Sequence, residues 1–403
     1  MCANCPRLMA RILIISTSQP GANPRMKKEA DALSATGHDV HVLYSFRTTW
    51  ASKADRLIFD TCTWTHELIG GNPATRPCAY HFSRFLRKWD QWRGDKERAA
   101  CRGFRSFQSA IQSHSPDLVI GHNTGTLPLL SWAKVSLDIP VLFDAEDYHS
   151  GEFEEGSPEQ RQCQFLEDKN LPVIGAISAA SPLIGDAYHT RFPSLEVGIV
   201  NNAFPTSLQP NFHKDLPLPL KLVWFSQVIG LDRGLQQFFQ LLESLQGIRI
   251  DITLIGSSNP KTINELRDCL RHPEHQLKVL PPTPESELSL VLAQHHIGLT
   301  LESTKTLNRR LCRTNKLFMY PLTGCLMLVS STPGQDDFLD EHPETGISLS
   351  QWDEIEAIIR HWSEDLADLN EKREKAWLRA KNKLNWEMES QAHVERINSM
   401  LNR

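Results

Sequence analysis

The chain has 403 residues, more than one typical core requires, so we expect two domains. Hydrophobic residues make up 40% and charged residues 23%, as in soluble globular proteins, and the net charge of −5 argues against a general nucleic-acid binder. No run approaches the roughly 18 apolar residues of a membrane span. The nine scattered cysteines fit a reducing cytoplasm better than a disulfide framework.

The first half of the chain alternates predicted strands and helices. A strand at 11–16, an amphipathic helix at 25–36 and a strand at 40–44 form a βαβ unit, which implies a parallel sheet. Residues 50–110 are rich in Trp, Arg and Phe without a clear period, and we expect helices and loops whose aromatic rings pack or line an acceptor path. We see no strongly basic amphipathic helix there or elsewhere. Further strands are expected at 117–121, 141–144, 173–178 and 197–202.

A proline-rich segment divides the pattern. Residues 205–219 contain four prolines in fifteen residues, which predicts a linker. Strands and helices then alternate again, with strands expected at 222–226, 250–255, 297–301 and 326–329, and a helical tail from about residue 353. We therefore predict an α/β protein with two doubly wound, Rossmann-like domains facing a cleft. The first domain should span 1–204 and the second 220–385, with a helix at 386–403 packing back toward the first domain.

Two cationic elements of the second domain predict a diphosphate site. Thr314 is a suitable helix N-cap, and a short helix beginning there would carry Asn315 and Lys316 in its first turn. Arg233 lies between Gly230 and Gly234 in a loop that joins a strand to a helix. Alone, that loop would be an ordinary βα turn with a surface arginine. Two such elements at one sheet edge favour binding of a diphosphate.

Polar residues follow two predicted strands of the first domain, where ligands of parallel sheets bind. His122 and Asn123 follow one strand, and the sequence 144–149 follows the next with Asp144, Glu146, Asp147 and His149. The acidic run is similar to the D-x-D or D-x-E metal site of some sugar transferases, but its carboxylates and histidine suit sugar hydroxyls equally well. We expect no metal, because the cationic groups of the second domain already neutralise phosphate.

Three common motifs are missing from the sequence. The loop after the first strand has no G-x-G-x-x-G, which argues against a dinucleotide-dependent dehydrogenase. The chain also has no P-loop signature of nucleotide kinases and no G-x-S-x-G nucleophile elbow.

Taken together, the motifs resemble the nucleotide-sugar glycosyltransferases of the GT-B architecture, specifically the large retaining family four, which includes bacterial surface-polysaccharide transferases. The resemblance covers nearly the whole chain. It is carried by residues 25–40 of the first helix and its turn, 116–122, 200–204, Arg233-Gly234, and above all 315–320 together with Gly324.

The resemblance implies that the second domain binds the donor nucleotide and the first binds the acceptor. The residues implied for the donor are Gln227, Gly230, Arg233, Gly234, Gly256, Asn308, Asn315 and Lys316. Those implied for the acceptor are Asn23, His122, Asn123, Asp144, Glu146, Asp147 and His149. The catalytic residues would be His122, Arg233 and Lys316, with no metal or other cofactor. Gln227 stands where many members of the family have arginine, and the two glutamates of the family's E-x7-E pair are Leu311 and Met319 here. We expect Asn308, Arg309 and 315–316 to replace that pair.

The expected reaction is transfer of a sugar, hexosyltransferase-like, from a nucleotide-sugar donor to a hydroxyl of a glycan or lipid-linked acceptor in polysaccharide biosynthesis. The family implies retention by front-face attack without a metal. A nucleotide-sugar epimerase of the same fold, and a non-catalytic partner subunit of a transferase, are the alternatives. We expect a cytoplasmic protein that does not bind nucleic acid and that could contact the inner face of a membrane through a lipid-linked acceptor.

Overall fold

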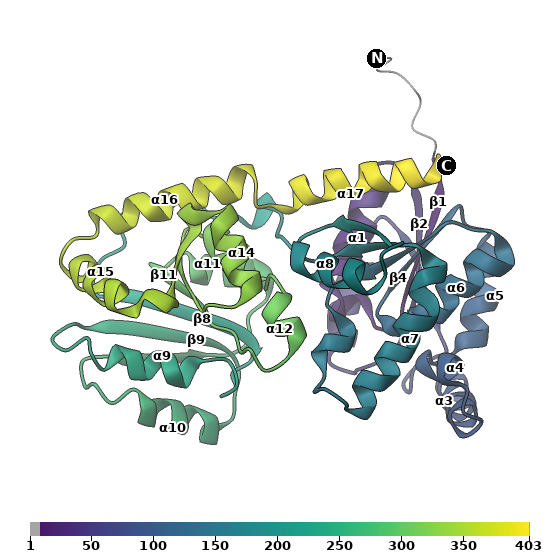
Figure 1. Ribbon diagram of the computed structural model, residues 1–403, viewed down its shortest axis with the longest axis horizontal. Helices are drawn as coiled ribbons and strands as arrows, with labels where there is room; N and C mark the ends of the chain where they lie inside the picture. Colours follow the sequence, from purple (N-terminus) through teal and green to yellow (C-terminus); the bar gives the residue numbers. More distant parts are fainter. Residues whose placement is uncertain (1–8, 403) are drawn as a thin grey trace, which may run out of the picture. The chain divides into compact units, whose positions relative to one another are not determined.

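The computed structural model describes residues 9–402, which form two compact α/β units (Figure 1). Unit 1 contains the chain up to Val200 together with the segment from Ser390 onward, and unit 2 is Asn201–Glu389. Both sheets are wholly parallel, and helices alternate with strands throughout. The prediction of two doubly wound, Rossmann-like domains is therefore confirmed.

The sheet of unit 1 has the order β3-β2-β1-β4-β5-β6-β7. Its strands are β1 (Arg11–Ser16), β2 (Asp39–Ser45), β3 (Thr65–Ile69), β4 (Leu118–His122), β5 (Val141–Ala145), β6 (Ala176–Ala179) and β7 (Glu196–Ile199). The helices are α1 (Pro24–Ala35), α2 (Ala51–Phe59), α3 (Pro77–Trp92), α4 (Lys96–Ala100), α5 (Phe104–His114), α6 (Leu127–Leu137), α7 (Pro158–Ile174) and α8 (Pro182–Arg191). The part of α17 (Trp386–Leu401) from Ser390 onward also belongs to unit 1.

The C-terminal helix α17 completes one face of the unit 1 sheet. Val394, Ile397 and Met400 of α17 share a buried cluster with Met26 and Leu33 of α1 and with the apolar side chains of β1, β2 and β4. The spacing of three residues between these α17 side chains keeps them on one side of the helix. Figure 1 shows α17 lying along α1 and the first strands. Two segments far apart in the sequence therefore build one layer of this core.

Two expected elements of unit 1 differ from the structure. The strand predicted at 173–178 begins only at Ala176, because Val173 and Ile174 form the last turn of α7, and Gly175 ends that helix with a φ of 77°. Residues 50–110 contain α2, β3, α3, α4 and most of α5. The single apolar run that usually indicates a strand is absent from Thr65–Ile69, which explains why β3 was not predicted.

The sheet of unit 2 has the order β10-β9-β8-β11-β12-β13. Its strands are β8 (Leu220–Val228), β9 (Ile250–Ser257), β10 (Gln276–Leu280), β11 (Ile297–Thr300), β12 (Leu326–Val329) and β13 (Gly346–Ser348). The helices are α9 (Leu235–Leu242), α10 (Pro260–Cys269), α11 (Glu285–Leu292), α12 (Leu307–Leu311), α13 (Lys316–Leu322), α14 (Pro333–Glu341), α15 (Trp352–Glu364) and α16 (Ala367–Asn382). One buried cluster lies on each face of this sheet, one around Trp224 and Phe238 and the other around Tyr320 and Phe338.

The segment predicted as a linker belongs to unit 2 instead, whose first residue is Asn201. The indole of Trp377 on α16 donates a hydrogen bond to the carbonyl of Pro210 at 3.1 Å, and its ring lies 6.1 Å from that of Phe212. Leu216 is buried. Proline excludes helix and sheet hydrogen bonding but does not prevent packing, so the four prolines misled the prediction. No helix in the described part of the chain is long and apolar enough to cross a membrane.

Candidate active site

The strand register of unit 1 places a row of polar side chains along the carboxyl edge of its sheet. Ser16 at the end of β1 pairs with His122 at the end of β4, His122 pairs with Asp144 on β5, and Asp144 pairs with Ser178 on β6. All four residues are at most 2% exposed. Parallel sheets bind ligands at this edge, so the row marks the functional end of unit 1.

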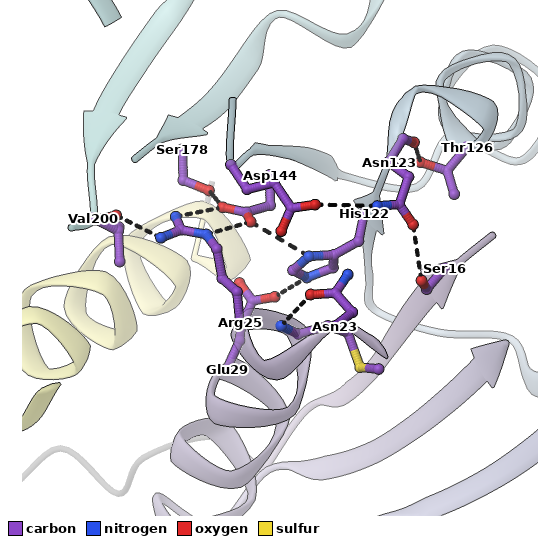
Figure 2. A network of polar contacts seen from close by, with 12 residues as sticks. Ser16, Asn23, Arg25, Glu29, His122, Asn123, Thr126, Asp144, Ser178 and Val200 are labelled. Atoms are coloured by element: carbon purple, nitrogen blue, oxygen red, sulfur yellow. Dashed lines mark hydrogen bonds and ion pairs between the residues drawn. The ribbon is translucent and has the colours of Figure 1, made fainter. Parts of the chain in front are cut away.

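Asp144 is held by a buried arginine from α1. Its two carboxylate oxygens accept hydrogen bonds from Nε and Nη2 of Arg25 at 2.6 and 2.8 Å, and a third from Ser178 Oγ at 2.6 Å (Figure 2). Arg25 Nη1 also donates to the carbonyl of Val200 at 2.7 Å. Burial alone would raise the pKa of Asp144, but the guanidinium of Arg25 holds it well below its usual range. Asp144 is thus fully engaged, and it holds Arg25 rather than offering its oxygens to a sugar.

A second carboxylate, Glu29, bridges two histidines. His122 donates from Nε2 to Glu29 Oε2 at 2.6 Å, and His393 of α17 donates from Nε2 to Glu29 Oε1 at 2.5 Å. His122 Nδ1 lies 3.3 Å from Asp144 Oδ2, within ion-pair range (Figure 2). Burial opposes ionisation of the imidazole, but Glu29 and then Asp144 raise the pKa of His122. Burial likewise opposes ionisation of the carboxylate, but His122 lowers the pKa of Glu29 to about 2. Because both ring nitrogens face carboxylates, the surroundings of His122 favour its charged form.

Two asparagines flank this cluster. Asn23 caps α1 by accepting a hydrogen bond from the Met26 amide at 3.0 Å. Its Nδ2 is buried and has no hydrogen-bond partner within residues 9–402. Asn123 has a φ of 70° and accepts a hydrogen bond from Ser16 Oγ at 3.1 Å (Figure 2). It also donates to Glu146 Oε1 at 3.2 Å. A non-glycine residue at positive φ is uncommon and often marks a functional site.

The acidic run that begins on β5 and continues beyond it does not form one cluster. Asp144 turns to Arg25, Glu146 turns to Asn123, and His149 pairs with Glu152 through Nδ1 at 2.8 Å. Burial opposes ionisation of His149, but Glu152 raises its pKa to about 9. The backbone carbonyl of Asp147 accepts from Tyr188. The described side chains contain one trio that could hold a metal ion, His41, Glu67 and His114, and it lies on β2, β3 and the end of α5 rather than in this run.

The main charged cluster of unit 2 centres on Glu302, which follows β11. Three cations approach its carboxylate: Lys316 at 3.3 Å, Arg233 at 3.4 Å and Arg309 at 3.5 Å. Arg309 also lies 3.4 Å from Asp232. The side chains of Glu302 and Lys316 are 3% and 5% exposed, whereas those of Arg233 and Arg309 are 29% and 28% exposed. The sequence therefore correctly paired Arg233 with Lys316 at one sheet edge but did not predict Glu302 between them.

Lys316 lies at the start of α13, but the predicted cap is wrong. The helix begins at Lys316 with Asn315 in the N-cap position, and neither Asn315 nor Thr314 caps it through a side-chain hydrogen bond. The ammonium lies 5.3 Å from the ring of Trp224 and 5.9 Å from that of Phe225, which are cation–π distances. Burial lowers the pKa of Lys316, and Glu302 opposes that shift.

The other residues predicted to bind the donor differ in position and exposure. Gly230 and Gly234 flank the Asp232-Arg233 turn, and Gly234 has a φ of 78° at the start of α9. Position 256 requires glycine for a structural reason, since a Cβ there would lie 2.4 Å from the carbonyl oxygen of Ser226. Gln227 and Asn315 are exposed, and Asn308 is buried on α12. The structure thus brings together Arg233, Lys316 and Arg309, the last of which was predicted only as a replacement for the missing glutamate pair.

Family models match both units. A glycosyl transferase 4-like domain matches residues 20–201, and a glycosyl transferase-like domain matches residues 233–393. The chain belongs to the GT-B glycosyltransferases of the family 4 type. No curated protein matches its sequence significantly.

Solved structures of other glycosyltransferases share the fold. A glycosyltransferase from Rickettsia africae is 11% identical with a TM-score of 0.68, covering 98% of this chain and 100% of that one. Anabaena Alr3699/HepE in complex with UDP-glucose is 14% identical with a TM-score of 0.67, covering 97% and 100%. Sucrose-phosphate synthase from Thermosynechococcus elongatus is 12% identical with a TM-score of 0.65, covering 98% and 99%. At these identities the likeness concerns the fold alone.

Several site residues of this glycosyltransferase were not predicted from the sequence. Arg25 and Glu29 belonged to the first-helix pattern without a role, and His393 and Glu302 were not singled out. A signal existed for the first two, because they lie four residues apart at the edge of the α1 stripe that contains Met26 and Leu33. A charged pair beside a buried stripe indicates buried partners. Nothing near His393 in the sequence points to Glu29, which is 364 positions away.

Proposed function

We propose that this glycosyltransferase takes its sugar from a nucleotide-sugar donor, whose diphosphate binds Arg233, Arg309 and Lys316 in unit 2. The observation that carries this proposal is the convergence of three cations on one carboxylate. Their distances to Glu302, 3.3 to 3.5 Å, are long for charge-assisted hydrogen bonds, which are usually 2.7 to 2.9 Å. Three cations against Glu302 and Asp232 leave one excess positive charge. Such loosely held cations can turn to a diphosphate with little loss.

The chemistry of the donor fits the same residues. As the bond to the sugar breaks, negative charge develops on the leaving diphosphate, and prearranged cations stabilise it most where water is scarce. Lys316 is nearly buried, so its charge is little screened. These groups would do the work of a divalent metal, and we propose a metal-independent reaction. The complexes of Anabaena Alr3699/HepE with UDP and with UDP-glucose make UDP-hexoses the first donors to test.

For unit 1 we propose binding of the acceptor, a hydroxyl of a glycan or of a lipid-linked sugar, at the edge that carries His122. The unpartnered Nδ2 of Asn23 and the strained Asn123 support this assignment. We also propose retention by front-face attack, with the departing phosphate as the base. The two buried carboxylates at this edge support it, since Asp144 is held by Arg25 and Glu29 by two histidines, and neither is free to act as a nucleophile.

Calorimetry with UDP tests the donor site. Lys316→Ala and Arg233→Ala should each weaken UDP binding by roughly 1.5–3 kcal/mol, the value of a hydrogen bond to a charged group. Arg249→Ala is the matched control, since Arg249 is a half-exposed arginine of the same unit that pairs with Asp251 instead. Unchanged UDP affinity in both site variants would refute the assignment.

Incubation with labelled UDP-sugars tests the reaction class. Slow release of free sugar indicates a transferase whose acceptor is missing, whereas conversion to an isomeric UDP-sugar indicates an epimerase. If no nucleotide sugar or nucleoside diphosphate binds, a non-catalytic partner subunit is the better interpretation.

A further inference from the structure

Helix α3 of unit 1 carries an exposed stripe of aromatic rings. Phe82, Phe85, Trp89 and Trp92 are 62%, 60%, 44% and 77% exposed. Their spacing of three, four and three residues places them on one side of the helix. The rings of Trp89 and Trp92 lie 5.1 Å apart, so the stripe is continuous at its end. Large contiguous apolar patches are rare on the surfaces of soluble proteins and mark sites of interaction.

The orientation of α3 is the reverse of that of an ordinary surface helix. Its two buried residues are polar, Ser83 and Asp90. Ser83 donates to the carbonyl of Gly70 at 2.8 Å, and Asp90 forms two hydrogen bonds with Arg105 at 3.0 and 3.1 Å. A surface helix normally buries its apolar side against its own core. Here polar contacts fix the helix, and they leave the aromatic side outward.

Positive charge surrounds the stripe. Residues 76–98 contain seven Lys or Arg against three Asp or Glu, a net charge of +4 in a protein whose total is −5. Arg84, Lys88 and Arg93 are all exposed, and Asp90 is buried in its pair with Arg105. Figure 1 shows α3 beside the short helix α4, at the margin of unit 1. The exposed charge around the rings is therefore almost entirely positive.

We propose that α3 docks this glycosyltransferase onto the surface of a lipid bilayer with anionic headgroups. Helices with Trp, Phe or Leu on one side and Lys or Arg beside it lie in the membrane interface, where the rings enter the acyl boundary and the cations meet the headgroups. Tryptophan is itself enriched at that depth. The sequence alone did not single out α3 as an amphipathic helix, because which of its side chains are exposed is known only from the structure. The proposal rests on α3 alone and does not depend on the identity of the donor or acceptor.

Charge and area favour a bilayer over a second copy of the chain. A copy would present the same cations to these cations, and like charges repel across an interface. A stripe of four rings on one helix is also narrow compared with the roughly 800 Å² that each partner buries in a standard protein interface. An anionic bilayer complements both features, because it supplies negative headgroups and an apolar layer a few ångströms below them.

Flotation of the full chain with vesicles tests the proposal. One set is phosphatidylcholine alone, and the other is phosphatidylcholine mixed with phosphatidylglycerol. The wild-type protein should float with the anionic vesicles and should detach as salt is added. Phe85→Ser with Trp92→Ser should weaken partitioning by roughly a hundredfold, since burying one large apolar side chain corresponds to about tenfold. Arg84→Gln with Lys88→Gln should weaken binding to anionic vesicles by roughly fivefold per charge.

The matched control is Leu57→Ser with Val135→Ser, two side chains of unit 1 that are 67% and 73% exposed but lie outside α3. This variant should bind vesicles as the wild type does. Circular dichroism and thermal unfolding show whether each variant is folded, which we expect because all the substituted side chains are largely exposed. The proposal fails if the wild-type protein floats with neither vesicle, or if the Phe85/Trp92 variant floats equally well. It also fails if sedimentation shows a dimer that this variant abolishes while vesicles remain unbound.

Discussion

Replacing Glu302 with glutamine separates two roles for the carboxylate at the centre of the unit 2 cluster. In the first role, Glu302 occupies the position that the donor diphosphate takes and keeps Lys316, Arg233 and Arg309 together until the donor arrives. In the second, Glu302 contacts the donor directly, for example through a sugar or ribose hydroxyl. The distances of 3.3 to 3.5 Å to all three cations favour the first role. Glutamine keeps the shape of the side chain and one acceptor oxygen but removes the charge.

The burial of each partner sets the expected magnitudes. Removing one member of a buried ion pair costs about 3–5 kcal/mol. Only Lys316 is buried, at 5% side-chain exposure, while Arg233 and Arg309 can turn to water. With an acceptor oxygen retained, Glu302→Gln should therefore lower the free energy of unfolding by about 2–3 kcal/mol, slightly less than that range. UDP should bind about tenfold more tightly, because it no longer displaces a carboxylate.

Denaturant unfolding gives the first quantity and calorimetry with UDP the second. Calorimetry of the variant and the wild type is performed at the same pH, because burial already lowers the pKa of Lys316 and the substitution removes the charge that opposes this shift. Glu341→Gln is the control, since Glu341 pairs with Arg313 in the same unit, outside this cluster. If Glu302→Gln weakens UDP binding tenfold while stability is unchanged, Glu302 contacts the donor and our reasoning about its role is wrong.

Three further predictions concern unit 1. Asp144→Asn should lower the free energy of unfolding by about 3–5 kcal/mol, because it leaves Arg25 buried without a counter-charge. The control Glu371→Gln changes an exposed side chain and should have no measurable effect. Equal stability of the two variants would refute the importance of the Arg25–Asp144 pair. The raised pKa of His122 predicts a stabilising contribution that is complete below about pH 6.5 and is lost as the pH rises through the folded-state value. In unfolding experiments from about pH 6 upward, His122→Gln should make this pH dependence smaller than in the wild type. The raised pKa of His149 leaves a remaining slope in both proteins, so a slope equal to that of the wild type would contradict the prediction. His393→Leu should lower turnover without changing the KM for the donor, because Glu29 loses one hydrogen-bond donor and His122 is held less firmly. His393→Gln should restore part of the lost turnover. Equal turnover of both variants and the wild type would show that His393 contributes packing alone.

Most strands of the fold were predictable because their sequences are continuous apolar runs, as parallel strands covered on both faces require. Arg11–Ser16 and Leu326–Val329 are examples. The strands that escaped prediction lie at sheet edges: β10 alternates polar and apolar residues, and β13 has three residues. An edge strand needs less apolar surface, so composition does not distinguish it from a loop.

The site was predictable only where the sheet itself determines position. His122, Asp144 and Lys316 follow from the rule that ligands bind at the carboxyl ends of parallel strands. Glu302 obeys the same rule, two residues beyond β11, and could have been found from it. Arg25, Glu29 and His393 come from helices, and their meeting depends on how α1 and α17 pack on one sheet face. That packing is a tertiary fact that no local spacing in the sequence contains.

The two charged clusters differ in a way that separates support from ligand binding. In the cluster of unit 1 the ion pairs measure 2.5 to 2.6 Å, apart from the 3.3 Å contact of His122 with Asp144, and every member is buried. An incoming ligand would therefore have to break strong bonds in a medium of low dielectric constant. In unit 2 the contacts exceed 3.2 Å, and two of the three cations reach solvent. Rearranging the second cluster therefore costs little free energy. A diphosphate, with more negative charge than a single carboxylate, attracts the three cations more strongly than Glu302 does. The tight cluster therefore fixes His122 in place, and the loose one is where a diphosphate can enter.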